Sequence, residues 1–513
     1  MHAKDGVTTV AAMTLILFAG KGLGLVRDML FAAVVGGGEL ADAFMFASVV
    51  PRTLLDAMFA AAITASFIPV FNDSLTKFGK EQAFALANSF LNIVLAASAV
   101  VVALGMLFAP AIAGFGGAGF APYYANLAAN LLRLIMPLIV LGCAAFTLVG
   151  ILQSFGQFYI PAAMSLLSNI VIIAYYVLFF GTFGIYGLAA VFLLGWVLQL
   201  LVQIPFLRRY GYRYRPRINV NMPGMSDIFK LLGPAMLFTW VLPVNLIVNT
   251  FAVTHIVGGS AAIGLSNTVY TIVTGVFVLS VANVIFPRLS RLAAGSDDQT
   301  FGTVLRGSLK GLLYLLVPMS AGLAVVSPVL VRVLFQRGEF TPETSLLTST
   351  ALSFFAAGIV GFGAQNVLAR GFFSCKDGRT PLITGITAVA LNLAVSFGLV
   401  DRLGIAAPAL GSALAMTLCG CVLFAVMYRR NPAVWNAAAS RDAAKMAVCA
   451  VPMSLAASFA LTITGGDGLA ADVVSLILAV SSGAVVYLAL TYALAVSEAR
   501  MAADYILGKL GKV

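Results

Sequence analysis

The chain has 513 residues, of which 61% are hydrophobic and only 10% are charged, and its mean hydropathy is +1.02. This composition excludes an ordinary soluble globular protein and indicates a membrane protein with many spanning helices, and the length leaves no room for a large soluble catalytic domain. The net charge of +11 reflects 30 Lys and Arg residues against 19 Asp and Glu residues.

Apolar stretches separated by polar breaks predict fourteen transmembrane helices. In chain order they cover residues 7–34, 40–71, 84–113, 123–153, 161–181, 185–207, 231–256, 262–286, 304–327, 345–373, 381–400, 404–428, 444–464 and 470–497. The first stretch carries Lys21, Arg27 and Asp28 in place of a cleavage site, so we expect it to stay as a helix and not to be removed as a signal peptide.

The basic residues of the loops predict the orientation of the chain. Twenty of them fall in loops on the side of the N-terminus: Lys4, Lys77, Lys80, Arg208, Arg209, Arg213, Arg215, Arg217, Lys230, Arg288, Arg291, Lys376, Arg379, Arg429, Arg430, Arg441, Lys445, Arg500, Lys509 and Lys512. The opposite side has only Arg332, Arg337 and Arg402. The positive-inside rule therefore predicts a multi-pass membrane protein with both termini in the cytoplasm.

The same distribution argues against a nucleic-acid partner, because topology already accounts for the net positive charge. The run from Arg208 to Arg217 is interleaved with Tyr210, Tyr212 and Tyr214. Such a run is typical of a cytoplasmic loop with interfacial aromatic residues, and it is also able to contact anionic lipid head groups.

An internal duplication with an offset near 220 residues divides the chain. Ser154 stands seven residues before Pro161, as Ser374 stands before Pro381, and Gly184 and Gly404 each open the next apolar run. Six helices per half give a parallel repeat. The sequence therefore predicts an all-α polytopic membrane protein with a first lobe of six helices (1–218), a second lobe of six helices (219–432) and two C-terminal helices with a tail (433–513).

Charged residues inside the first two predicted helices are the candidate functional residues. They are Lys21, Arg27, Asp28, Asp42 and Arg52. Each charge at the centre of a spanning helix costs at least about 2.5 kcal/mol, so it must meet a partner, water or a ligand.

Two interpretations of these charges stay open. In the first interpretation, the charges form ion pairs that hold helices together, Arg27 with Asp42 or Asp56 and Lys21 with Asp28. Alternatively they line a cationic, water-filled cavity, for which phosphate or pyrophosphate is the best matched ligand.

Sequence signatures of enzymes are missing. The chain has no P-loop, two histidines, and five cysteines without the spacing of a metal or redox site. We therefore expect a transporter that hydrolyses no ATP, uses no cofactor and no metal, and is driven by membrane potential, an ion gradient or product removal.

Several motifs occur in the order and spacing of one known family. They are Gly24-Leu25-Val26-Arg27-Asp28, Gly36-Gly37-Gly38, Ala41-Asp42-Ala43-Phe44, Pro51, Phe67-Ile68-Pro69-Val70-Phe71, Gly233-Pro234-Ala235, Phe286-Pro287-Arg288-Leu289-Ser290, the stretch from Leu334 to Thr341, and that from Leu368 to Ser374 with Thr380-Pro381. With these motifs the chain resembles the MurJ family of lipid II flippases over essentially its whole length.

This resemblance implies a multidrug/oligosaccharidyl-lipid/polysaccharide exporter fold of fourteen helices, two lobes and a hydrophobic groove formed with the last two helices. It implies transport of the undecaprenyl-pyrophosphate-linked peptidoglycan precursor from the inner to the outer leaflet. The implied contacts with the head group are Lys21, Arg27, Asp28 and Asp42, and Arg52 is a further candidate. Membrane lipids are the other expected partners.

The chain also departs from the family. Leu55 stands where the family commonly has an Arg, and Thr268 and Thr271 stand where it usually has an Arg and a Glu. The alternatives are therefore a flippase for another polyprenyl-linked glycan, a drug/cation antiporter of the same fold, and a non-transporting scaffold that recruits cell-wall synthases.

Overall fold

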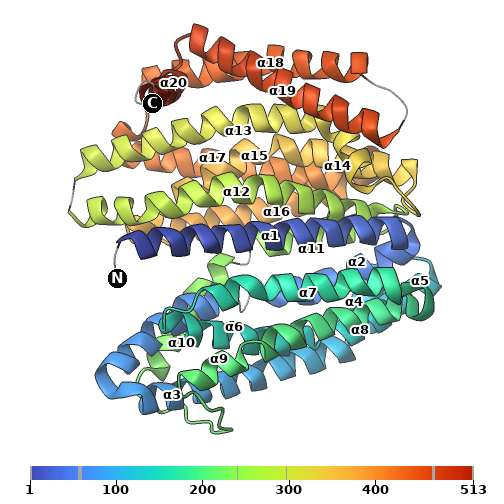
Figure 1. Cartoon of the computed structure of the whole chain (residues 1–513), viewed down its shortest axis with the longest axis vertical. Helices are drawn as coiled ribbons and strands as arrows, with labels where there is room; N and C mark the ends of the chain where they lie inside the picture. The colour runs from blue at the N-terminus through green and yellow to red at the C-terminus, as the bar shows by residue number, and fades with distance from the viewer. Residues whose placement is uncertain (1–2, 56–60, 240, 296, 465–467, 511–513) are drawn as a thin grey trace. The chain divides into compact units, whose positions relative to one another are not determined.

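The described residues of the chain are helical and contain no β-strand (Figure 1). The structure, a computed structural model, describes residues 3–55, 61–239, 241–295, 297–464 and 468–510. The chain forms two compact units, one of Met1–Ala261 with Gly338–Phe340 and the other of Ala262–Arg337 with Thr341–Val513.

Helices of the first unit follow the first seven predicted segments. They are α1 (Ala3–Val35), α2 (Glu39–Leu55), α3 (Ala61–Leu107), α4 (Ala109–Gly116), α5 (Pro122–Ile135), α6 (Leu138–Ser154), α7 (Tyr159–Leu178), α8 (Phe180–Leu201), α9 (Ile204–Arg209), α10 (Met225–Thr239) and α11 (Val241–Ala252). Inside α3, Gly79 leaves the helical conformation (φ 80°, ψ 178°) and so separates the second predicted segment from the third.

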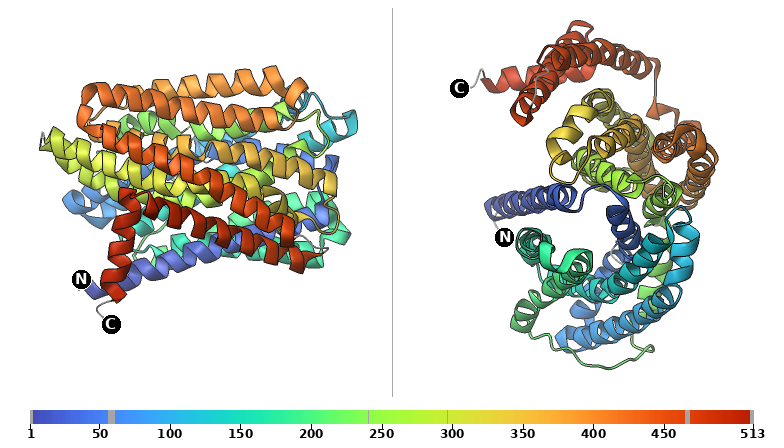
Figure 2. Two further views of the ribbon diagram at one scale, coloured as in Figure 1. Left: turned by 90° about the horizontal axis from the view of Figure 1, so that it is seen from above. Right: turned by 90° about the vertical axis from the view of Figure 1, so that its right-hand side faces the viewer.

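The second unit holds the remaining helices. They are α12 (Gly259–Ala294), which begins in the first unit, α13 (Asp298–Phe335), α14 (Pro342–Ala357), α15 (Ile359–Ser374), α16 (Arg379–Leu403), α17 (Ala406–Arg430), the short η2 (Pro432–Val434), α18 (Ala437–Thr464), α19 (Leu469–Ala493) and α20 (Ser497–Leu510). Figure 2 shows α18 and α19 side by side, with α20 turning off the end of α19.

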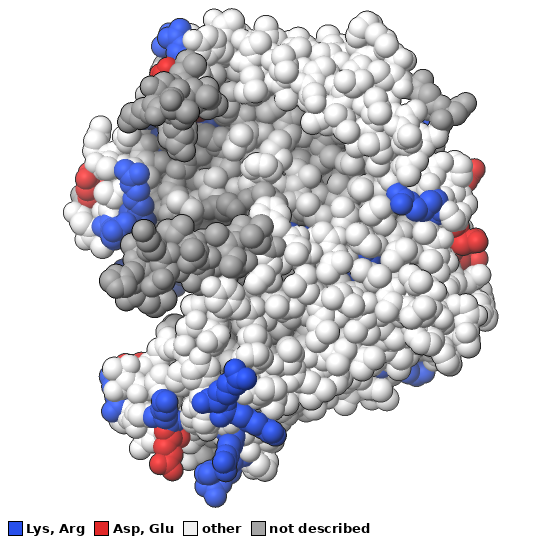
Figure 3. All heavy atoms as spheres, viewed as in Figure 1, with Lys and Arg blue, Asp and Glu red and all other residues white. Residues whose placement is uncertain are grey.

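Among the described residues, ten of the fourteen predicted membrane crossings coincide with helical stretches that could span a bilayer. Among the described residues, nine helical stretches are long and apolar enough to span a bilayer, and α14 with α15, bent by 44°, makes a tenth. The other four predicted segments lie in α1, in α2 with the start of α3, in α10 with α11, and in α12. On the face shown in Figure 3, the charged side chains gather near the ends of the helices. An all-helical polytopic fold is therefore confirmed.

Each unit packs around its own apolar contacts. In the first, α1 lies against α7, α2 against α5, and α3 against α6 and α10. The buried rings of Phe67 and Phe90 stack within α3 with centroids 5.0 Å apart. In the second, α16 packs on α17, and α13 packs on α18 and α19 through Tyr314, Met453 and Tyr487.

The sequence repeat reappears as a repeat of backbone conformation. Gly156 (φ +77°) and Lys376 (φ +59°) both take the left-handed conformation in the turns after α6 and α15. Gly184 (φ 53°, ψ −146°) and Gly404 (φ 55°, ψ −134°) share a second unusual conformation at the same offset. Since such values are rare outside glycine, their recurrence 220 residues apart indicates that the two halves follow one backbone plan.

Candidate functional site

The candidate residues of α1 lie where this helix approaches α7. A side-chain carbon on Gly20 would stand 2.8 Å from the hydroxyl of Ser165, and one on Gly24 would stand 3.7 Å from the amide of Asn169, whereas Gly22 faces open space. Two small residues four apart let helices in a membrane approach closely. The glycines of this segment therefore set the distance between α1 and α7.

Arg27 is held by two partners. Its Nη2 and Nε lie 2.7 and 2.9 Å from Oδ1 of Asp28, which is buried. Its Nη1 donates to Oδ1 of Asn169 at 3.2 Å, and Nδ2 of Asn169 donates to the carbonyl of Gly20. The guanidinium is thus paired with a carboxylate and fixed in direction.

Asn169 is a residue that the sequence analysis did not single out. It is buried in α7 and bridges two positions of α1 that are two turns apart. The available signal was a single amide in the middle of the apolar segment 161–181, but its partner depends on which helices pack together.

Lys21 differs from Arg27 because its side chain is exposed and forms no ion pair with a described residue. The predicted pairing of Lys21 with Asp28 does not form, and Arg27 pairs with Asp28 and not with Asp42. Asp56, the other predicted partner of Arg27, lies outside the described residues.

Asp42 caps another helix. Its side chain is buried, and its Oδ2 and Oδ1 accept the backbone N–H groups of Gly258 and Ala261 at 2.6 and 2.9 Å. These N–H groups belong to the start of α12, where the first turn has no partners of its own and the helix dipole favours a negative charge. Asp42 therefore fixes the start of α12 against α2.

Arg52 is exposed near the end of α2, and its guanidinium carbon lies 5.9 Å from the centre of the Phe192 ring on α8. This distance is within the range of a cation–π contact, which directs the guanidinium over the ring.

The three residues that depart from the expected pattern make local contacts. Leu55 is buried, and a side-chain carbon on Gly142 of α6 would stand 2.4 Å from its methyl group, so this position belongs to the core of the first unit. The hydroxyls of Thr268 and Thr271 donate to the carbonyls of Gly264 and Asn267 in their own helix.

The second unit contains an apolar groove of about 540 Å³. Its walls come from α12, α13, α18 and α19, with Phe277, Met319 and Leu488 among the lining residues, and none of the described lining residues is charged. The groove expected beside the last two helices is therefore present within this unit.

No group of three or more His, Cys, Asp or Glu side chains that could hold a metal ion occurs among the described residues. The described side chains of α1 offer cations and α7 offers the amide of Asn169, while the groove of the second unit offers apolar surface.

Comparisons with known proteins agree on one family. The sequence model described as "Lipid II flippase MurJ" matches residues 31–480, a span that contains Asp42 and Arg52 and begins after Lys21, Arg27 and Asp28. The probable lipid II flippase MurJ of Vibrio cholerae is 29% identical, with 77% of this chain and 76% of that protein covered. The lipid II flippase MurJ of Burkholderia cenocepacia is 25% identical, with 84% and 85% covered.

Solved structures show the same fold. A lipid II flippase MurJ in an inward closed conformation superposes with a TM-score of 0.79 and 22% identity, covering 94% of this chain and 98% of that one. An inward-facing multidrug resistance MATE family transporter gives a TM-score of 0.65 and 15% identity, covering 81% and 95%. The chain is a multi-pass membrane transporter and belongs to the MurJ family of lipid II flippases.

Proposed function

We propose that this protein moves the undecaprenyl-pyrophosphate-linked peptidoglycan precursor from the inner to the outer leaflet of the bacterial inner membrane by alternating access. The supporting observation is the arrangement on α1, where Lys21 is exposed without an acidic partner among the described residues and Arg27 is oriented by Asp28 and Asn169. Cations prepared in this way bind a pyrophosphate by charge-assisted hydrogen bonds. Asp28 acts on the head group indirectly, by orienting Arg27, and Asp42 does so by fixing the start of α12 against α2. Arg52 is a further contact with the head group.

The apolar groove between α13, α18 and α19 is the place for the polyprenyl chain. An uncharged wall of this kind removes isoprenoid surface from water, and it contains no charged group that would need a polar partner in the bound chain. A substrate with a diphosphate and a long hydrocarbon chain matches both the cations of α1 and the apolar groove. A cationic drug or a metal cation, in contrast, would be repelled by the positive charge of Lys21.

Lys21→Ala is the sharpest test of this proposal. The side chain is exposed and forms no ion pair with any residue in the described part of the chain, so we expect its removal to leave the fold intact. Loss of one charge-assisted hydrogen bond of about 1.5–3 kcal/mol predicts roughly 10- to 100-fold weaker binding of lipid II. Complementation of a flippase-depleted bacterium and binding of purified protein to lipid II measure the effect.

Lys77→Ala is the matched control, because Lys77 is exposed and its one ion pair among the described residues is with Asp73, four positions before it. Full complementation by an expressed Lys21→Ala protein, with lipid II binding equal to that of Lys77→Ala, would contradict the assignment. Arg27→Ala alone is a poor test, since it leaves the buried carboxylate of Asp28 without its partner.

Complementation of a flippase-depleted bacterium also distinguishes the rival functions. A scaffold for cell-wall synthases binds its protein partner but moves no lipid, and a flippase for another glycan moves a polyprenyl lipid that carries a different head group. Lipid II that becomes accessible at the outer leaflet in cells relying on this chain supports the proposed substrate. Labelling of cysteines placed at either terminus tests the predicted cytoplasmic position of both ends.

A further inference from the structure

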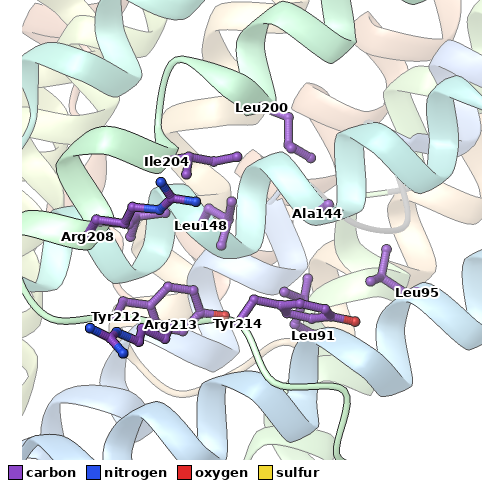
Figure 4. Close-up of a pocket in the computed structure, with 11 residues that line it drawn as sticks. Leu91, Leu95, Ala144, Leu148, Leu200, Ile204, Arg208, Tyr212, Arg213 and Tyr214 are labelled. Atoms are coloured by element: carbon purple, nitrogen blue, oxygen red, sulfur yellow. The ribbon is translucent and has the colours of Figure 1, made fainter.

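The first unit contains a cavity whose lining residues are far in sequence from the candidate residues of α1. It measures about 720 Å³ and lies between α3, α6, α8, α9 and the loop that follows α9 (Figure 4). Most of its wall is aliphatic, with Leu91, Leu95, Leu148, Leu200 and Ile204 among the lining residues. We name this space the α3–α9 cavity.

Arginines lie at one edge of the α3–α9 cavity. Arg208 and Arg213 line it, are exposed, and form no ion pair with a described acidic residue. Arg213 also lines a neighbouring polar cavity of about 600 Å³ together with Lys80, Arg215 and Arg217, and with Glu81 as its acidic member. The apolar space therefore adjoins a surface with an excess of positive charge.

The loop that carries these arginines is fixed to α3 by two asparagines. Asn88 donates to the carbonyl of Arg213 at 3.1 Å, and Asn92 donates to the carbonyls of Arg215 and Arg217 at 3.0 and 2.9 Å. Both asparagines are buried and stand one helical turn apart. Their amides therefore hold the loop in an extended form along α3.

Alternation in this extended segment separates tyrosines from arginines. The hydroxyls of Tyr212 and Tyr214 donate to the side-chain oxygens of Asn88 and Asn92 at 2.8 and 2.6 Å, while Arg213 is exposed between them. The tyrosine hydroxyls are thus satisfied by the protein, and the guanidinium group of Arg213 is left for a ligand.

The sequence repeat supplies an internal comparison. In the second unit, a cavity of about 400 Å³ lies between α13, α15 and α17, and its Ala364 and Gly420 stand 220 residues after Ala144 and Leu200 of the α3–α9 cavity. Trp435 lines that second space, and no described Lys or Arg does. The basic edge is therefore a property of the first unit and not of the repeat itself.

We propose that the α3–α9 cavity is a binding site for an anionic phospholipid of the cytoplasmic leaflet, distinct from the transported substrate. An acyl chain lies against the leucines of α3, α6 and α8, and the phosphate lies between Arg208 and Arg213. Guanidinium groups match phosphate oxygens in geometry and charge, and basic pockets between helices at the cytoplasmic side of a membrane favour anionic head groups. The apolar wall and the charged edge together require an amphipathic ligand.

Native mass spectrometry of the full chain in detergent, titrated with phosphatidylglycerol and with phosphatidylcholine of the same acyl chains, tests this site. We expect phosphatidylglycerol to be retained preferentially by the parent protein. Arg208→Gln with Arg213→Gln should weaken its binding about 30-fold, because each basic residue near an anionic surface contributes about 1 kcal/mol and two are removed. Ala144→Phe, which adds a ring to the wall, should reduce binding without changing charge.

Arg209→Gln with Arg429→Gln is the matched control, since both residues are exposed and neither lines a described cavity. Equal binding of both lipids, or equal phosphatidylglycerol binding by the test and control variants, overturns the proposal. Competition by glycerol phosphate as strong as that by the whole lipid also overturns it, because the site would then bind a free anion. Unchanged thermal unfolding of each variant confirms that the fold is intact.

Discussion

Individual charged side chains on α1 and α2 divide into those that are exposed and those that hold other groups of the protein. Lys21 is exposed, while Asp28 is buried beside Arg27 and Asp42 is buried beneath the start of α12. The sequence identified all of these charges, because ionised groups in an apolar stretch stand out by their cost. It did not identify their partners, since Asn169 and Gly258 are brought there only by the packing of helices.

Asp42→Ala should destabilise the protein by about 1–2 kcal/mol, the range measured for loss of a helix cap. Both carboxylate oxygens accept backbone N–H groups, so Asp42→Asn, which keeps one acceptor oxygen, should lose less. Thermal unfolding in detergent measures both changes, with Asp73→Asn as an exposed control. An unchanged melting temperature for Asp42→Ala would show that the cap contributes nothing.

Arg27 and Asp28 should be strongly coupled. Removal of either partner from a buried pair costs about 3–5 kcal/mol, because the remaining charge is stranded. We therefore expect Arg27→Gln and Asp28→Asn each to lower the melting temperature, and the double variant to lower it by much less than their sum. Additive effects in this double-mutant cycle would mean that the ion pair of 2.7 Å carries no interaction energy.

Elements of the fold are predictable where hydrophobicity alone decides. An apolar stretch in a bilayer must be helical, because every backbone N–H and C=O needs a partner within the segment. The apolar segments of the sequence are predicted by this rule. The capping of α12 by Asp42 is not, since it joins residues that are 216 positions apart in the chain.

Asp377 organises the start of α16. Its Oδ1 accepts the backbone N–H groups of Arg379 and Thr380 at 3.0 Å each, and its Oδ2 accepts from Thr380 and from Arg430 at 2.8 and 2.7 Å. Burial opposes ionisation of this carboxyl, but the hydrogen bonds from Thr380 and Arg430 outweigh it and lower the pKa of Asp377 to about 2. The turn before α16 therefore depends on a charged aspartate.

This depressed pKa predicts a pH dependence with a definite sign. The pKa lies below its ordinary value of 3.8, so the stabilisation by Asp377 is complete above about pH 4 and is lost as pH falls toward 2. Asp377→Asn should lower the melting temperature at about pH 6, and the difference from the parent chain should shrink as the pH approaches 2. A difference that stays constant over this range would exclude a contribution from the ionised carboxylate.

The whole molecule carries its duplication in backbone conformation as well as in sequence. Gly156 and Lys376 occupy the same left-handed turn, but only the first is a glycine. The repeat was predictable from Ser154, Pro161 and their counterparts. The conformation of Lys376 was not, because a lysine gives no sign that it has a positive φ.

Lys376→Gly should therefore raise the stability of the chain by about 1 kcal/mol, because a side chain in the left-handed conformation costs roughly that much. Gly156→Ala should lower it by a similar amount. Gly181→Ala, at a glycine without positive φ and with open space around it, is the control. A lower melting temperature for Lys376→Gly would show that its side chain stabilises the turn by more than the strain.

Residues Gly338–Phe340 illustrate how the two halves of the gene product depend on each other. The N–H of Glu339 donates to the carbonyl of Ala33 at 2.9 Å, Phe340 is buried, and a side chain on Gly338 would collide with that same carbonyl. This tripeptide is part of the first unit although the chain on both sides of it belongs to the second. A fragment that ends at Ala261 would lack this tripeptide of its own unit. Two co-expressed fragments divided at that point should therefore regain activity only if the second fragment supplies Gly338–Phe340 to the first.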